Sequence, residues 1–146
     1  MNENPSAIAT ATATPAAPPT TRPKILVIDD DRDLAQMIGL RLHALGYEAS
    51  VANDGPSGIN LAKKVVPDLI VLDVMMPGMD GFEVCAALKK QLGAACPKII
   101  LLSAVTSGLV VDPAAILKQS GADAFIPKPY DAPTVRAKIN ELLGIN

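Results

Sequence analysis

The chain has 146 residues, of which 49% are hydrophobic and 19% charged, and its formal net charge is −2. This length predicts one domain with enough core to fold unaided. The slightly acidic balance and the 3% aromatic content argue against nucleic acid as a partner, because such binding needs a basic patch or a base-stacking platform. Aliphatic runs last only about four residues, whereas a membrane span needs about 20, so no membrane insertion is expected.

The two cysteines, Cys85 and Cys96, match no zinc-binding spacing. A domain of this size does not need a disulfide scaffold, which favours a reducing, cytoplasmic location. Residues 1–23 are rich in Ala, Thr and Pro, with no basic residue before Arg22. This composition predicts a disordered tail, distinct from a secretory signal. The tail is either inert or a docking or localising segment, and residues 24–146 form the expected folded domain.

Short uncharged runs follow the tail at regular intervals. They occupy residues 25–28, 69–72, 99–102 and 124–126. Because their aliphatic residues do not alternate with polar ones, they predict strands buried on both faces of a parallel sheet. Residues 47–52 are less apolar and alternate more, which predicts an edge strand.

Apolar residues at helical spacing lie between and after these runs. Pro113 follows Asp112 and predicts a short fourth helix over about residues 113–120, and Asp131 predicts the N-cap of the last helix. The order is strand then helix, repeated five times, which predicts a five-stranded parallel sheet with helices on both faces. The other four helices are predicted by the stripes Leu34, Ile38, Leu42, Leu45; Ile59, Ala62, Val65, Val66; Phe82, Cys85, Ala86, Leu88; and Val135, Ile139, Leu142, Leu143.

Polar residues end or follow the predicted strands. They are Asp29 and Asp30, Asp73, Ser103 and Lys128. The carboxyl ends of parallel strands share one edge of the sheet, where open α/β sheets bind ligands. One lysine cannot neutralise three carboxylates, so a divalent cation is implied, and hard oxygen ligands favour Mg²⁺ or Mn²⁺. A carboxylate left free could attack phosphorus and form an aspartyl phosphate.

Several segments resemble a response-regulator receiver domain. They are residues 24–31, residues 67–81 with the pattern Asp-x-Met-Met-Pro-x-Met-Asp-Gly, Ser103-Ala104 and Lys128-Pro129. The resemblance implies a flavodoxin-like three-layer α/β/α sandwich with strand order 2-1-3-4-5. It also implies a phosphoacceptor switch of two-component signalling, and no enzyme with a separate substrate.

The same resemblance implies roles for individual residues. Asp73 would accept phosphate from a phosphohistidine, with Lys128 and Ser103 binding the phosphoryl oxygens. Asp30, Asp73 and the backbone carbonyl of Met75 would ligate Mg²⁺, and Asp29 would do so through water. Further implied positions are the switch residue Phe125, the small Ala104 that leaves the phosphate access, and apolar Met75 and Val105, which predict slow hydrolysis.

The implied partners are a sensor histidine kinase or a histidine phosphotransfer protein, together with a downstream protein target. Because the chain ends at Asn146, we expect a stand-alone regulator that is monomeric or a weak phosphorylation-dependent dimer. Leu109, Val110 and Val111 belong either to core packing or a mobile loop, or to an interaction patch.

Two alternatives remain open. Asp29 and Asp31 also resemble the Asp-x-Asp of haloacid-dehalogenase phosphatases, with Asp29 as nucleophile and Asp31 as acid/base. A degenerate receiver that is regulated without phosphate is the other alternative. Asp31 could equally do no more than cap the first helix.

Overall fold

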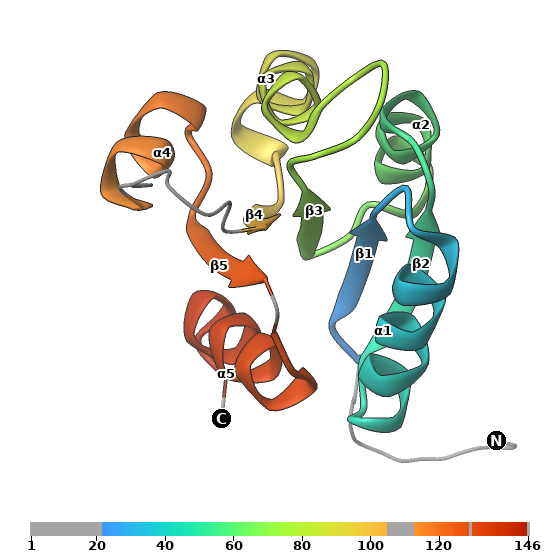
Figure 1. The fold of residues 1–146 in the computed structure, drawn as a ribbon. Coiled ribbons are helices and arrows are strands. Elements are labelled where there is room, and N and C mark those ends of the chain that lie inside the picture. The colour runs from blue at the N-terminus through green and yellow to red at the C-terminus, as the bar shows by residue number, and fades with distance from the viewer. Residues whose placement is uncertain (1–21, 105–112, 129, 146) are drawn as a thin grey trace, which may run out of the picture.

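The computed structural model describes residues 22–104, 113–128 and 130–145. Its centre is a five-stranded sheet in the order β2-β1-β3-β4-β5, with every neighbouring pair parallel (Figure 1). This confirms the predicted flavodoxin-like order and places β2 and β5 at the edges. The strands are β1 (Lys24–Ile28), β2 (Glu48–Ala52), β3 (Leu69–Asp73), β4 (Lys98–Ala104) and β5 (Ala124–Lys128).

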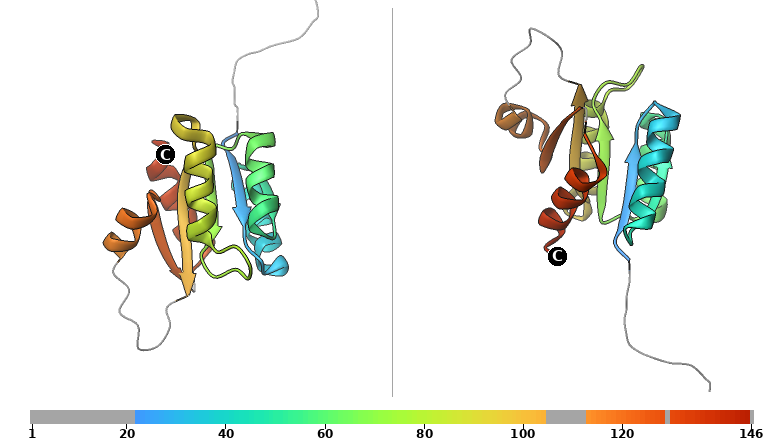
Figure 2. Two further views of the ribbon diagram at one scale, coloured as in Figure 1. Left: turned by 90° about the horizontal axis from the view of Figure 1, so that it is seen from above. Right: turned by 60° about the horizontal axis from the view of Figure 1, so that its bottom comes forward.

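Helices cover both faces of the sheet and make three layers. α1 and α5 lie on one face, and α2, α3 and α4 lie on the other, as the views in Figures 1 and 2 show. None of the helices in the described part of the chain is long and apolar enough to cross a membrane. The helices are α1 (Arg32–Ala44), α2 (Gly55–Val65), α3 (Gly81–Leu92), α4 (Pro113–Ser120) and α5 (Ala132–Leu143), with a 3-10 turn η1 (Gly93–Ala95) after α3.

The predicted two-sided burial of the central strands is confirmed. All five residues of β3 are buried. In β1, Leu26 and Ile28 pack toward α2 and α3, whereas Ile25 and Val27 pack toward α1 and α5. Successive side chains of a strand point to opposite faces, so each aliphatic run supplies both cores at once. This burial makes the sheet a rigid platform for the polar residues at its carboxyl edge.

The helix starts largely follow the prediction. Asp131 caps α5, with its carboxylate accepting a hydrogen bond from the Thr134 amide at 2.9 Å. α4 begins at Pro113 as expected. The residues 1–21 of the tail, the segment Leu109–Val111 and Val105 lie outside the described residues, so their predicted roles stay predictions.

The stripe predicted for the third helix is confirmed for Cys85 and Leu88 and is wrong for Phe82 and Ala86. Val84, Cys85 and Leu88 are fully buried, whereas Phe82 is 39% exposed and Ala86 is exposed. The reason is that α3 begins at Gly81, so the buried positions fall at intervals of three and four from that residue. Phe82 is thereby placed on the outer side of the first turn.

Two further residues of the predicted stripes lie beyond the ends of their helices. Leu45 is the C-cap of α1 and is 38% exposed, and Val66 is the C-cap of α2 and is 67% exposed. Val66 has a φ of 48° and is the one non-glycine residue with positive φ in the described part of the chain. The left-handed conformation crowds a β-branched side chain against its own backbone. The turn between α2 and β3 is therefore locally strained.

We expect Val66→Gly to raise the free energy of unfolding by about 1 kcal/mol, because glycine adopts positive φ without a steric penalty and little burial is lost. Urea denaturation followed by circular dichroism measures this change. The matched control is Val65→Gly, inside α2, which should lower stability by about 0.5–1 kcal/mol. Equal destabilisation by both substitutions would contradict the assignment of strain to Val66.

Candidate functional site

The carboxyl edge of the sheet gathers the acidic residues that the sequence singled out. Asp29 directly follows β1, and Asp73 is the last residue of β3, its neighbour in the sheet. One carboxylate oxygen from each of Asp29, Asp30 and Asp73 lies within 4.8 Å of the others. Asp29 is 1% and Asp73 2% exposed, while Asp30 is exposed. We call these three residues the acidic site.

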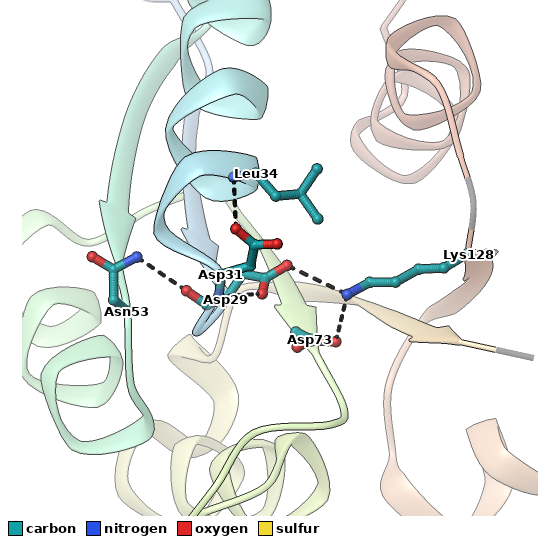
Figure 3. Close-up of polar contacts among 6 residues, drawn as sticks. All are labelled: Asp29, Asp31, Leu34, Asn53, Asp73 and Lys128. Atoms are coloured by element: carbon teal, nitrogen blue, oxygen red, sulfur yellow. Dashed lines mark hydrogen bonds and ion pairs between the residues drawn. The ribbon is translucent and has the colours of Figure 1, made fainter. Parts of the chain in front are cut away.

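Hydrogen bonds hold Asp29 in place on both its backbone and its side chain (Figure 3). Its amide donates to the carbonyl of Ala52 at 3.1 Å. Its carbonyl accepts from Nδ2 of Asn53 at 3.0 Å, as Figure 3 shows. Its Oδ1 accepts from the amide of Asp31 at 3.0 Å. The other oxygen, Oδ2, is left to face Asp73 and Lys128.

Lys128 reaches the acidic site from the end of β5. Its Nζ lies 3.0 Å from Oδ1 of Asp73 and 3.6 Å from Oδ2 of Asp29 (Figure 3). Burial by itself lowers the pKa of Lys128, but the two carboxylates outweigh it, and the net pKa is raised. The ammonium is thus kept charged between the two buried carboxylates.

The pKa of Asp73 is raised from 3.8 to about 6. Loss of solvent around the buried carboxylate is the largest cause, and the negative charge of Asp29 adds to it. Lys128 acts in the opposite direction and only partly compensates. Without a further cation, the site therefore holds more negative charge than one ammonium neutralises.

This charge imbalance fits a divalent metal. Oδ2 of Asp29 and Oδ1 of Asp73 are buried without a hydrogen bond, and Lys128 is the cation that contacts them within the described residues. Two ligand oxygens of one Mg²⁺ lie at most about 4.2 Å apart. Three carboxylate oxygens that lie within 4.8 Å of one another are close enough to gather around one such ion, directly or through water. The donor set, which is oxygen without thiolate or imidazole, favours Mg²⁺ or Mn²⁺ over zinc.

Asp31 stands apart from the acidic site. Its Oδ1 accepts a hydrogen bond from the amide of Leu34 at 3.0 Å and so caps α1 (Figure 3). An aspartate in this place satisfies an otherwise unpaired helix amide and complements the helix dipole. Capping of α1 explains this aspartate, and it is one of the roles that the sequence left open for Asp31.

The remaining predicted residues lie on β4, on β5 and in the loop after β3. Ser103 is half-buried on β4 and lies in register with Pro127, and Ala104 lies in register with Lys128. Phe125 is half-buried on β5 and packs against the core under α2, α3 and α4. Met75, two residues after Asp73, has a side chain that is 68% exposed.

Asn53 and Tyr130 near the site were missed at the sequence level, and Gly81, which ends the quoted motif, was given no role there. Asn53 supports Asp29, and its place after β2, at the same sheet edge, was an available signal. Gly81 packs so closely that a Cβ there would come within 2.5 Å of the Asp73 carbonyl oxygen. The hydroxyl of Tyr130 is buried without a hydrogen bond to any described residue, and burial together with Asp29 and Asp73 raises its pKa. A single sequence shows neither how closely Gly81 packs against β3 nor that the hydroxyl of Tyr130 is buried.

Fold and acidic site together are those of the receiver class. The family model for the response regulator receiver domain matches residues 25–140, and the chain belongs to this family. Receiver domains are typically phosphoacceptors, not enzymes with a separate substrate. Their acidic triad is typical of a Mg²⁺ site, and they partner histidine kinases.

Individual relatives show the same family. The DNA-binding response regulator MtrA of Mycobacterium tuberculosis is 37% identical over 127 residues, which cover 87% of this chain and 53% of that protein. The DNA-binding dual master transcriptional regulator RpaA of Synechocystis is 37% identical over 121 residues, covering 83% of this chain and 49% of that protein. The chain therefore spans about half the length of these curated relatives.

Solved structures agree with this assignment. The Francisella response regulator 1452 receiver domain superposes with a TM-score of 0.70 at 32% identity, covering 83% of this chain and 96% of that one. Vibrio cholerae chemotaxis protein CheY4 gives a TM-score of 0.73 at 29% identity, with 83% of this chain and 98% of that one covered. The similarity thus extends over nearly the whole of each solved domain.

The raised pKa of Asp73 has a definite consequence for stability. The folded chain binds this proton more tightly than the unfolded chain, so the contribution of Asp73 is fully present below pH 3.8 and is lost as the pH rises through about 6. We therefore expect Asp73→Asn to raise the free energy of unfolding in metal-free buffer at pH 8, by about 1–3 kcal/mol. Urea titrations at pH 5 and pH 8 measure the difference.

Mg²⁺ should make the wild type more stable than Asp73→Asn at pH 8. It binds the folded wild-type site and stabilises it by mass action, while Asp73→Asn lacks one ligand. Asp33→Asn, which removes an exposed carboxylate of α1, serves as the control and should leave both the pH profile and the Mg²⁺ effect unchanged. An Asp73→Asn protein that loses stability at pH 8 without metal would show that Lys128 already compensates the site.

Proposed function

We propose that this chain is a phosphorylation switch: Asp73 accepts a phosphoryl group from a phosphohistidine of a sensor kinase or a histidine phosphotransfer protein. The observation that carries the proposal is the placement of Lys128 Nζ 3.0 Å from the buried Asp73 carboxylate, beside two further carboxylates. A buried carboxylate with a raised pKa and a nearby charge partner is the kind of group found at reactive sites.

The chain's own residues support each part of the transfer. An oxygen of Asp73 attacks phosphorus as the bond from phosphorus to the imidazole nitrogen breaks, and that nitrogen keeps the electron pair. Lys128 lies where it can bind an oxygen of the transferred group. When bound by Asp30, Asp73, the Met75 carbonyl and, through water, Asp29, Mg²⁺ supplies positive charge that offsets the crowded oxygens.

We further propose that Ser103 and Phe125 transmit the change. Ser103 lies on β4 just past Leu102, the register partner of Asp73, and this position supports a role for its hydroxyl in binding a phosphoryl oxygen. Phe125 of β5 is the register partner of Leu101 on β4, and it packs against the core toward α4. An inward turn of its ring would follow a shift of Ser103. The surface made by α4, β5 and α5 would then bind a downstream protein, with the chain a monomer or a weak phosphorylation-dependent dimer.

Phosphorylation by a small donor tests the proposal directly. We expect the chain with Mg²⁺ and acetyl phosphate to gain one phosphoryl group by intact-mass spectrometry, and Asp73→Asn to gain none. Asp29→Asn should still be labelled, but more slowly by about tenfold or more, because a supporting charge is lost. Asp33→Asn is the matched control and should be labelled like wild type.

The position of the label separates the competing functions. A phosphoryl group on Asp29, with Asp73→Asn still labelled, would favour the phosphatase-like alternative. Absence of any label, with the fold intact and Mg²⁺ bound, would favour a receiver that works without phosphate. Each of these results contradicts the proposal.

The lifetime of the phosphoryl group depends on whether a water molecule can line up behind phosphorus. Met75 and Val105 are apolar, and neither can hydrogen-bond such a water, so we expect slow loss of phosphate. Met75→Asn should speed the loss by about threefold or more, since an exposed amide at this position can orient water. The decay of the phosphorylated mass after removal of the donor measures it, with Met37→Asn on α1 as the control; equal decay in both variants would contradict the role of Met75.

A further inference from the structure

The outer edge of β2 is unpaired among the described residues, where β1 is the one strand beside it (Figure 1). The amide of Glu48, the first residue of β2, donates to the carbonyl of Pro23, which directly precedes β1, at 2.9 Å. Backbone groups of successive residues in a strand point to opposite sides. Those of Ser50 therefore also face β1, whereas those of Ala49 and Val51 point away from it. The edge thus offers amides and carbonyls to a further strand.

β2 carries little of the protection that edge strands usually have. Its one charged residue is Glu48 at its start, and neither lysine nor proline occurs in it. The register between β2 and β1 runs without a bulge. A groove of about 480 Å³ lies beside the end of the strand, lined by Val51 and by Ser57 and Lys64 of α2. The edge is therefore accessible as well as weakly protected.

The N-terminal tail contains a stretch with the pattern of a strand. Residues 6–14, which lie outside the described residues, read Ser-Ala-Ile-Ala-Thr-Ala-Thr-Ala-Thr between Pro5 and Pro15. A β-branched residue stands at every second position from Ile8 to Thr14, with alanine at the positions between them. β-Branched residues favour strands, in which alternate side chains share one face. The tail as a whole is predicted to be disordered, but this stretch is suited to pair with an existing edge.

The tail enters the fold at the amino end of β2, where Pro23 is bonded to Glu48. The eight residues 15–22 connect this point to the alternating stretch, and three of them are proline. An extended, proline-rich segment of this length spans about 25 Å, whereas neighbouring strands lie about 5 Å apart. The connection is therefore long enough to bring residues 6–14 to the outer side of β2. A strand formed there runs toward the amino end of β2 and is antiparallel to it.

Two properties favour the tail over a second copy of the chain as the occupant of this edge. Residues 6–14 carry no charge and consist mostly of alanine and threonine, so they bring only small side chains into the groove. A second copy would bring its own α1 and α2, which both pack against β2, into the same space. The connection also holds the stretch at a local concentration in about the millimolar range, while pairing of two copies depends on the protein concentration.

We propose that residues 6–14 add to the outer edge of β2 as a sixth, antiparallel strand, which hydrogen-bonds to the backbone of Ala49 and Val51. The added strand closes the edge at which the sheets of two copies would otherwise pair. This proposal goes beyond the phosphorylation switch, and it requires neither Asp73 nor Mg²⁺.

Hydrogen exchange of single amides, followed by NMR on the isotope-labelled full chain, tests the proposal. The double variant Thr10→Pro/Ala11→Pro removes two successive amides from the stretch, one of which faces β2 in any register. The amides of Ala49 and Val51 should exchange about tenfold or more faster in this variant than in wild type. The amide of Ser50, which faces β1, should exchange at the same rate in both proteins.

The matched control is Ala16→Pro/Ala17→Pro, which places two prolines in the connection and should leave the amides of Ala49 and Val51 as protected as in wild type. Asp73→Asn should also leave both amides protected, so failure of the switch and failure of the added strand are separable. Equal exchange of the two amides in wild type and Thr10→Pro/Ala11→Pro would overturn the proposal. Protection that persists in that variant and rises with protein concentration would overturn it too, because it places a second copy on the edge.

Discussion

The crowding of carboxylates at one edge of a parallel sheet is the interaction on which the rest of the structure depends. Asp29 and Asp73 are almost fully buried and share a single ammonium, that of Lys128. Burial disfavours the ionised form of a carboxylate, and this raises the pKa of Asp73. The same imbalance that makes the metal-free site unfavourable fits the binding of a divalent cation.

Burial of the aliphatic strands offsets the free-energy cost of the buried carboxylates. Every residue of β3 is buried, so the carboxyl end of the strand is held rigidly where Asp73 emerges. Close packing continues on the far side, since Gly81 leaves no room for a side chain against the Asp73 carbonyl. A site whose reactive oxygen must meet phosphorus with small tolerance benefits from such fixed positions.

Local patterns in the sequence determined the strands, the strand order through the receiver resemblance, the caps at Asp31 and Asp131, and the polar residues at one sheet edge, because each depends on neighbouring residues or on a recognisable motif. Only the tertiary structure decided that Lys128 contacts both Asp29 and Asp73, that Phe82 faces outward while Val84 is buried, and that the hydroxyl of Tyr130 is buried. The reason is physical: these features depend on distances between segments far apart in the chain and on how much water packing removes, and neither quantity is written in local periodicity.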